Sequence, residues 1–124
     1  MAELKFKAFF KVDGRIYEAL SIDFVNEEVS LWDEETSEGF EASFEDIELL
    51  QFAGFKDKNG MEIYTGFFVR WGLRTYKICF DCGFYMHDLS KINPDYPITK
   101  EFKNASDEFE IVGNIYENPN LEIK

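Results

Sequence analysis

The sequence is poor in the residues that small proteins use for cross-linking, metal binding and membrane insertion. It has one histidine and two cysteines among 124 residues, too few for the disulfide framework of a small secreted domain. No stretch approaches the roughly 18 apolar residues of a membrane span. The first residues alternate charged and apolar side chains, so they lack the apolar core of a signal peptide. We therefore expect a cytoplasmic protein that makes no contact with membranes.

Basic residues are also scarce, and one long stretch has none. No Lys or Arg lies between Arg15 and Lys56, and residues 1–50 carry 14 acidic and 4 basic residues, which is −10 of the chain's net charge of −12. Nucleic acids and anionic lipids attract proteins through Lys and Arg, so direct binding to either is unexpected. The acidic residues are instead a candidate surface for a protein partner. The ten candidates are Asp23, Glu27, Glu28, Asp33, Glu34, Glu35, Glu38, Glu41, Glu45 and Asp46.

The chain nevertheless has the composition of a folded domain, with 45% hydrophobic and 18% aromatic residues. Short alternating apolar and polar stretches separated by Gly-containing turns predict strands. Asp13-Gly14 predicts a hairpin between residues 4–11 and 15–20, followed by a second strand pair at 21–24 and 28–32. Further strands are predicted at 67–71, 75–80, 84–88 and 109–115. Ser43 and Asp46 predict a short capped helix, or one turn of one, near 43–50. Residues 89–107 are predicted to form a long irregular excursion.

These patterns favour a mainly β fold, or a β-dominated α+β fold, with little helix. A small barrel and a sandwich both fit the short strands and their turns. We expect an acidic N-terminal β-hairpin lobe at residues 1–50 and a second lobe at 51–124, or one compact unit that contains both.

Three segments of the sequence, Lys5–Phe9, Gln51–Gly66 and Ile111–Pro119, resemble the YopX-like family of bacteriophage and prophage proteins. The resemblance implies an SH3-like barrel in the C-terminal part and a bacterial host cytoplasm as the working site. It implies no activity, so no catalytic or binding residue is carried over. The family usually has Asp after the glycine that corresponds to Gly66, and this sequence has Phe67 there.

The same segments have a structural explanation that requires no function. Asn59-Gly60 sets a turn, while Gly54, Gly66 and Gly113 allow bends or close approaches of the backbone. We favour this structural explanation of the family motifs.

Cys79 and Cys82 have the C-x-x-C spacing of zinc knuckles and redox pairs. His87 supplies a third ligand, but a structural zinc needs four. A redox pair needs a helix N-terminus to lower the pKa of its first thiol, but this pair lies in a predicted hairpin turn. A metal site at Cys79, Cys82 and His87 is therefore a remote alternative. We expect no cofactor and, because no known nucleophile, zinc or nucleotide motif is present, no enzymatic activity.

The sequence thus favours a non-enzymatic phage accessory protein that binds a host protein. Carboxylates at alternating strand positions repeat about every 7 Å, near the spacing of backbone phosphates, so the acidic lobe could mimic nucleic acid. The plainer alternative is that these acids only keep the protein soluble. Another is a structural or self-associating module, since aromatic residues are enriched at interfaces. Its candidate residues are Phe9, Phe67, Phe68, Trp71 and Tyr85.

Overall fold

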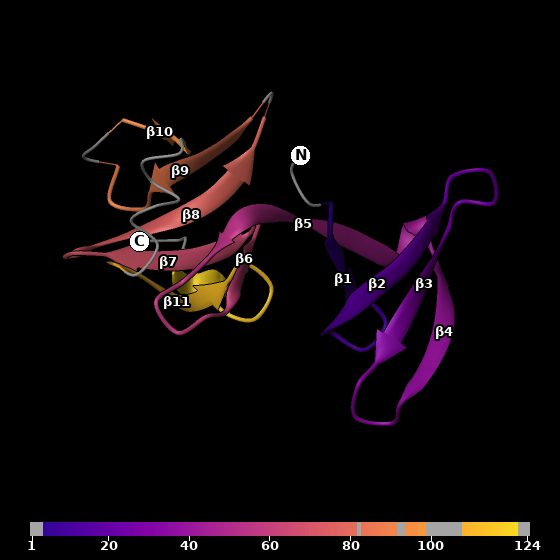
Figure 1. Cartoon of the computed structure of the whole chain (residues 1–124). Coiled ribbons are helices and arrows are strands. Elements are labelled where there is room, and N and C mark those ends of the chain that lie inside the picture. The colour runs from indigo at the N-terminus through magenta and orange to yellow at the C-terminus, as the bar shows by residue number, and fades with distance from the viewer. Residues whose placement is uncertain (1–3, 82, 92–93, 99–107, 122–124) are drawn as a thin grey trace. The chain divides into compact units, whose positions relative to one another are not determined.

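The computed structural model describes residues 4–81, 83–91, 94–98 and 108–121 (Figure 1). Strands make up most of this part of the chain, and its helical content is limited to short 3-10 turns. The predicted mainly β fold with little helix is confirmed. Within the same residues, no helix is long and apolar enough to cross a membrane. The chain divides into two compact units, Leu4–Gln51 and the chain from Phe52 onward.

The N-terminal unit is an antiparallel sheet with the strand order β4-β3-β2-β1-β5. Neighbouring strands in the chain are mostly neighbours in the sheet, as short turns require. Asp13-Gly14 forms the first turn, where Gly14 has φ +72°, which confirms the predicted hairpin. The strands are β1 (Phe6–Phe10), β2 (Arg15–Asp23), β3 (Glu28–Asp33), β4 (Glu38–Ser43) and β5 (Ile47–Lys56).

One local prediction for this unit is wrong, and another is confirmed in its shorter form. Residues 15–23 form one long strand rather than the ends of two strand pairs, because a register shift between Ala19 and Ser21 lets β2 continue along β3. The predicted capped helical turn near 43–50 is confirmed as one 3-10 turn, η1 (Phe44–Asp46), with Ser43 as its N-cap. From Ile47 the chain pairs with β1 instead, because this pairing satisfies backbone hydrogen-bonding groups and buries the side chain of Ile47.

The core of the N-terminal unit is one cluster of side chains from the strands of this sheet. Ala8 of β1 faces Tyr17 of β2, and both are buried together with Leu31 of β3, as alternation with a period of two predicts. Tyr17 packs edge-on against Phe40 with ring centroids 5.0 Å apart. The other buried members of the cluster are Val29, Ala42 and Ile47.

The C-terminal unit contains a second antiparallel sheet with the strand order β10-β9-β8-β7-β11. The end of β5 reaches into this unit, where Phe52 and Lys56 pair with β6. The predicted strands at 67–71, 75–80, 84–88 and 109–115 are confirmed to within one residue at each end. The elements are β6 (Glu62–Tyr64), β7 (Phe67–Trp71), β8 (Arg74–Phe80), β9 (Phe84–Asp88), β10 (Tyr96–Pro97), β11 (Phe109–Asn114) and η3 (Pro119–Leu121).

The core of the second unit is built mainly from strand residues at alternating positions. Val69 of β7 faces Tyr76 of β8, and two residues further along β8 Ile78 faces Met86 of β9. Phe109 of β11 contacts Phe55 with ring centroids 5.7 Å apart. The SH3-like barrel stays a prediction for this unit. The predicted excursion at 89–107 contains the short strand β10, and its residues 92–93 and 99–107 lie outside the described residues.

Candidate functional site

The ten acidic candidates all belong to the N-terminal unit, but they do not form one even array. Most of them lie at strand ends and turns (Figure 1). One set surrounds the β2–β3 turn, with Asp23, Glu27 and Glu28, and another surrounds the β3–β4 turn, which includes Glu34 and Glu35. The surface therefore consists of three groups of carboxylates, and the third is Glu45 and Asp46 in η1.

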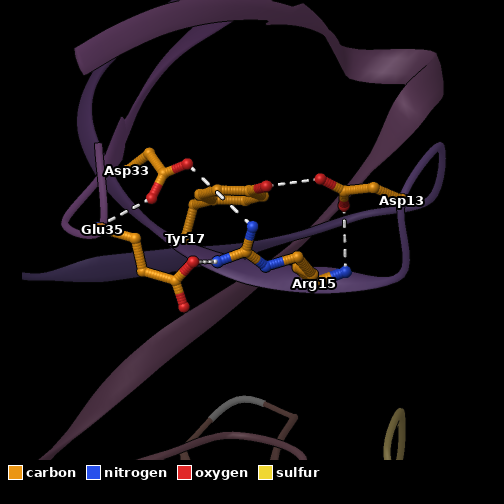
Figure 2. A network of polar contacts seen from close by, with 5 residues as sticks. All are labelled: Asp13, Arg15, Tyr17, Asp33 and Glu35. Carbon is orange, nitrogen blue, oxygen red and sulfur yellow. Dashed lines mark hydrogen bonds and ion pairs between the residues drawn. The ribbon is translucent and has the colours of Figure 1, made fainter. Parts of the chain in front are cut away.

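The group at the β3–β4 turn is organised by a single cation, Arg15 (Figure 2). Its Nη2 lies 3.1 Å from Oε2 of Glu35, and its Nη1 lies 4.0 Å from Oδ2 of Asp33. Its backbone N–H donates to Asp13 Oδ1 at 3.0 Å, and the hydroxyl of Tyr17 donates to Asp13 Oδ2. The guanidinium carbon lies 5.3 Å from the centroid of the Tyr17 ring, a cation–π contact.

These contacts change the electrostatics at that end of the sheet. The charge of Glu35 is the largest cause that raises the pKa of Arg15, and the hydrogen bond to Asp13 is the largest that raises the pKa of Tyr17. Arg15 offsets part of the charge of Asp33 and Glu35, and the exposed Glu34 and Glu38 add further negative charge in the same turn region. Exposed ion pairs add little stability; the effect of Arg15 is on charge distribution.

The group at the β2–β3 turn is organised differently, because its acids interact with the backbone and with each other. Asp23 accepts hydrogen bonds from the backbone N–H groups of Val25 and Asn26, and the bond from the Asn26 backbone is the largest cause that lowers its pKa. The side chain of Glu28 hydrogen-bonds that of Glu41, which raises the pKa of Glu28. A hydrogen bond between two carboxyl groups requires a proton on one of them, so this contact with Glu41 of β4 favours the neutral form of Glu28.

The C-terminal unit has a buried carboxylate in the central family segment. Asp57 accepts hydrogen bonds from the backbone N–H groups of Asn59 at 2.9 Å and Met61 at 3.0 Å through Oδ1, and of Ile111 at 3.0 Å through Oδ2. It thereby joins the turn after β5 to β11 in the C-terminal family segment. Burial alone would raise the pKa of Asp57, but these donors outweigh it and lower the pKa.

Two glycines of the family segments, Gly66 and Gly113, lie close to neighbouring side chains. Gly66 has φ +83°, and a Cβ there would lie 3.3 Å from the Ile115 side chain. A Cβ on Gly113 would lie 2.5 Å from Oδ1 of Asn118, an oxygen that accepts a hydrogen bond from Asn114 N. The contacts at Gly66 and Gly113 therefore support the structural explanation of the family motifs.

The predicted alternative at Cys79, Cys82 and His87 receives no support from the described residues. Cys82 lies outside them, and no group of three potential metal ligands occurs within them. His87 Nδ1 instead contacts Asp95 Oδ1 at 2.8 Å, and the thiol of Cys79 donates to the carbonyl of Lys77 at 3.7 Å.

The aromatic residues proposed for self-association differ in their surroundings. Phe68 is completely buried, and Phe67 and Trp71 pack against the core of the C-terminal unit. Phe9 and Tyr85 are half-buried. Three of the five thus serve the interior of their own unit.

Comparison with known proteins places the chain in a family. The sequence model of the YopX protein family matches residues 5–122. The chain belongs to the YopX family. A crystal structure of protein EF1440 from Enterococcus faecalis resembles this YopX-family chain with a TM-score of 0.66 and 23% sequence identity, over 98% of this chain and 99% of that one. At this identity the likeness concerns the fold alone. A search of curated proteins gives no match.

The sequence interpretation missed two features of this YopX-family chain. It did not single out Arg15, although a lone base next to a turn and followed by an acidic stretch is a visible signal. It also missed the bulge in β2, for which the spacing of Tyr17, Ala19 and Ile22 is the signal: the period of two is broken between Ala19 and Ile22.

Proposed function

We propose that this YopX-family chain is a non-enzymatic phage or prophage accessory protein that works in the bacterial cytoplasm and binds a basic host protein through its N-terminal unit. The observation that carries the proposal is the charge of that unit. Residues 4–51 contain 13 acidic and 4 basic residues, a net charge of −9. A surface potential of one sign favours and accelerates encounter with a partner of the other sign. Mimicry of nucleic acid is the specific form of this function that we favour.

The test compares two triple variants of the full chain. Glu34, Glu38 and Glu45 are exposed acids of the N-terminal unit, and Asp81, Glu108 and Glu117 are exposed acids of the C-terminal unit. Changing either set to Lys alters the net charge by the same amount. Each protein is used to capture partners from bacterial cytoplasmic extract at about 50 mM and about 500 mM salt.

We expect a basic protein to be captured by the wild type and by the C-terminal variant, at low salt only, and to be lost with the N-terminal variant. The purified wild-type chain should then displace DNA or RNA from that partner. Equal capture by the two variants would contradict the proposal. Capture without displacement of nucleic acid would leave protein binding in place and remove mimicry.

A further inference from the structure

A hollow of about 400 Å³ opens on the surface of the N-terminal unit beside the bulge in β2. Its apolar lining comes from two segments: Leu4, just before β1, with Phe6 at the start of β1, and Ala19, Leu20 and Ile22 in β2. Because the register shifts between Ala19 and Ser21, no residue of β3 lies directly opposite Leu20. A bulge redirects side chains in this way, and Leu20 is 61% exposed.

This hollow differs from the scattered apolar residues of ordinary surfaces. A single exposed leucine requires no explanation. Here, however, Leu4 is 75% exposed next to the same hollow, and Phe24 and Val25 are exposed just after the end of the same strand. Phe24 packs against Phe44 and does not line the hollow, so the large apolar residues that the hollow brings together are Leu4, Phe6, Leu20 and Ile22. Exposed apolar side chains that gather beside polar ones are typical of a site for a partner.

The charge around the hollow determines which partner fits. The charged residues of the lining are Lys5 and Glu18, and Glu18 pairs with Lys7 (Nζ–Oε1 3.5 Å), so the lining itself is not acidic. The acidic residues follow further along the chain, with Asp23 at the end of the strand that carries Leu20 and Glu27 and Glu28 a few residues later. Lys5 is the only base in the lining that the structure describes. An apolar centre inside an acidic unit is complementary to a segment that carries both positive charge and a large apolar side chain.

We propose that the hollow beside Leu20 receives an apolar side chain from a basic segment of a partner protein. The inference rests on the proposed function and adds a location and a second chemical requirement. Positive charge brings the segment to the N-terminal unit, and the apolar side chain in the hollow fixes its position. Apolar anchors that fill a pocket dominate the affinity of most interfaces.

The experiment uses two synthetic peptides of lysine and glycine that differ only at the central residue, which is leucine in one and glycine in the other. Each is titrated into the full-length chain and followed by backbone amide shifts in NMR spectra. The leucine peptide should bind at least about tenfold more tightly and shift the amides of β2 around Leu20. The double variant Leu4→Ser, Leu20→Ser should lose this advantage.

The matched control is Leu73→Ser, because Leu73 is a fully exposed leucine of the C-terminal unit. This variant should keep the preference for the leucine peptide. If the double variant loses the wild-type circular dichroism spectrum, Leu20→Gln alone takes its place.

Three outcomes would overturn the proposal. If the two peptides bind equally, charge alone attracts the partner and the hollow is not its binding site. The proposed function is tested independently, by comparing capture of a host protein by the two triple charge variants. If the leucine peptide shifts amides away from β2, the anchor lies elsewhere. If the wild type sediments as a dimer and the double variant as a monomer, a second copy of the chain occupies the hollow.

Discussion

The substitution Asp57→Asn tests the connection between the two family segments. Asparagine has nearly the same shape as aspartate but only one acceptor oxygen. If that oxygen keeps the N–H groups of Asn59 and Met61, the amide group faces the N–H of Ile111. A buried donor without an acceptor costs about 1–3 kcal/mol, and hydrogen bonds to a charged acceptor are the stronger ones. We expect the free energy of unfolding to fall by about 2–4 kcal/mol.

The measurement is urea unfolding followed by tryptophan fluorescence. Trp71 belongs to the C-terminal unit and Trp32 to the N-terminal unit, so both proteins carry Trp32→Phe to leave one reporter. Hydrogen exchange of the Ile111 amide gives a local reading, since each 1.4 kcal/mol corresponds to about a tenfold faster exchange through opening. Asp81→Asn is the control, because Asp81 is exposed and should change stability by less than about 0.5 kcal/mol.

The pH dependence gives a second check with a defined sign. The folded-state pKa of Asp57 is lowered below that of the unfolded chain, which is about 3.9. Its ionised form therefore stabilises the fold above that value, and the contribution is lost as the pH falls through the folded-state pKa. The difference between wild type and Asp57→Asn should shrink below about pH 4. A difference below about 0.5 kcal/mol at pH 7 would refute the reasoning.

Two further substitutions test other local contacts. Gly113→Ala should destabilise the C-terminal unit by about 1–3 kcal/mol, because its Cβ would lie 2.5 Å from Oδ1 of Asn118; thermal unfolding measures this, and an unchanged Tm would contradict it. Tyr17→Phe removes the hydrogen bond to Asp13 and should cost about 0.5–1.5 kcal/mol. The raised pKa of Tyr17 means that its contribution is present below the unfolded-state pKa of about 10 and is lost as the pH rises through the folded-state value. Ultraviolet titration should find Tyr17 among the last tyrosines to ionise, and early ionisation would argue against the contact.

The sequence by itself determined the strands and the charge of this protein. Alternation of apolar and polar residues marks a half-buried strand wherever it occurs, so Phe6–Phe10 and Phe109–Asn114 were identifiable without a structure. The turn at Asp13-Gly14 was identifiable because Gly14 adopts a positive φ at little cost. The concentration of acids in residues 1–50 follows from counting alone.

The tertiary structure decided which of these residues act together. Residues 43–50 carry both helical and strand signals, and pairing of Ile47 with Phe10 selected the strand, since a long-range partner outweighs local propensity. Arg15 meets Glu35 only because β3 returns beside β2, and Leu4 meets Leu20 at one hollow only because β1 and β2 pair and β2 carries a bulge. Contacts between residues distant in sequence depend on strand register, which composition does not encode.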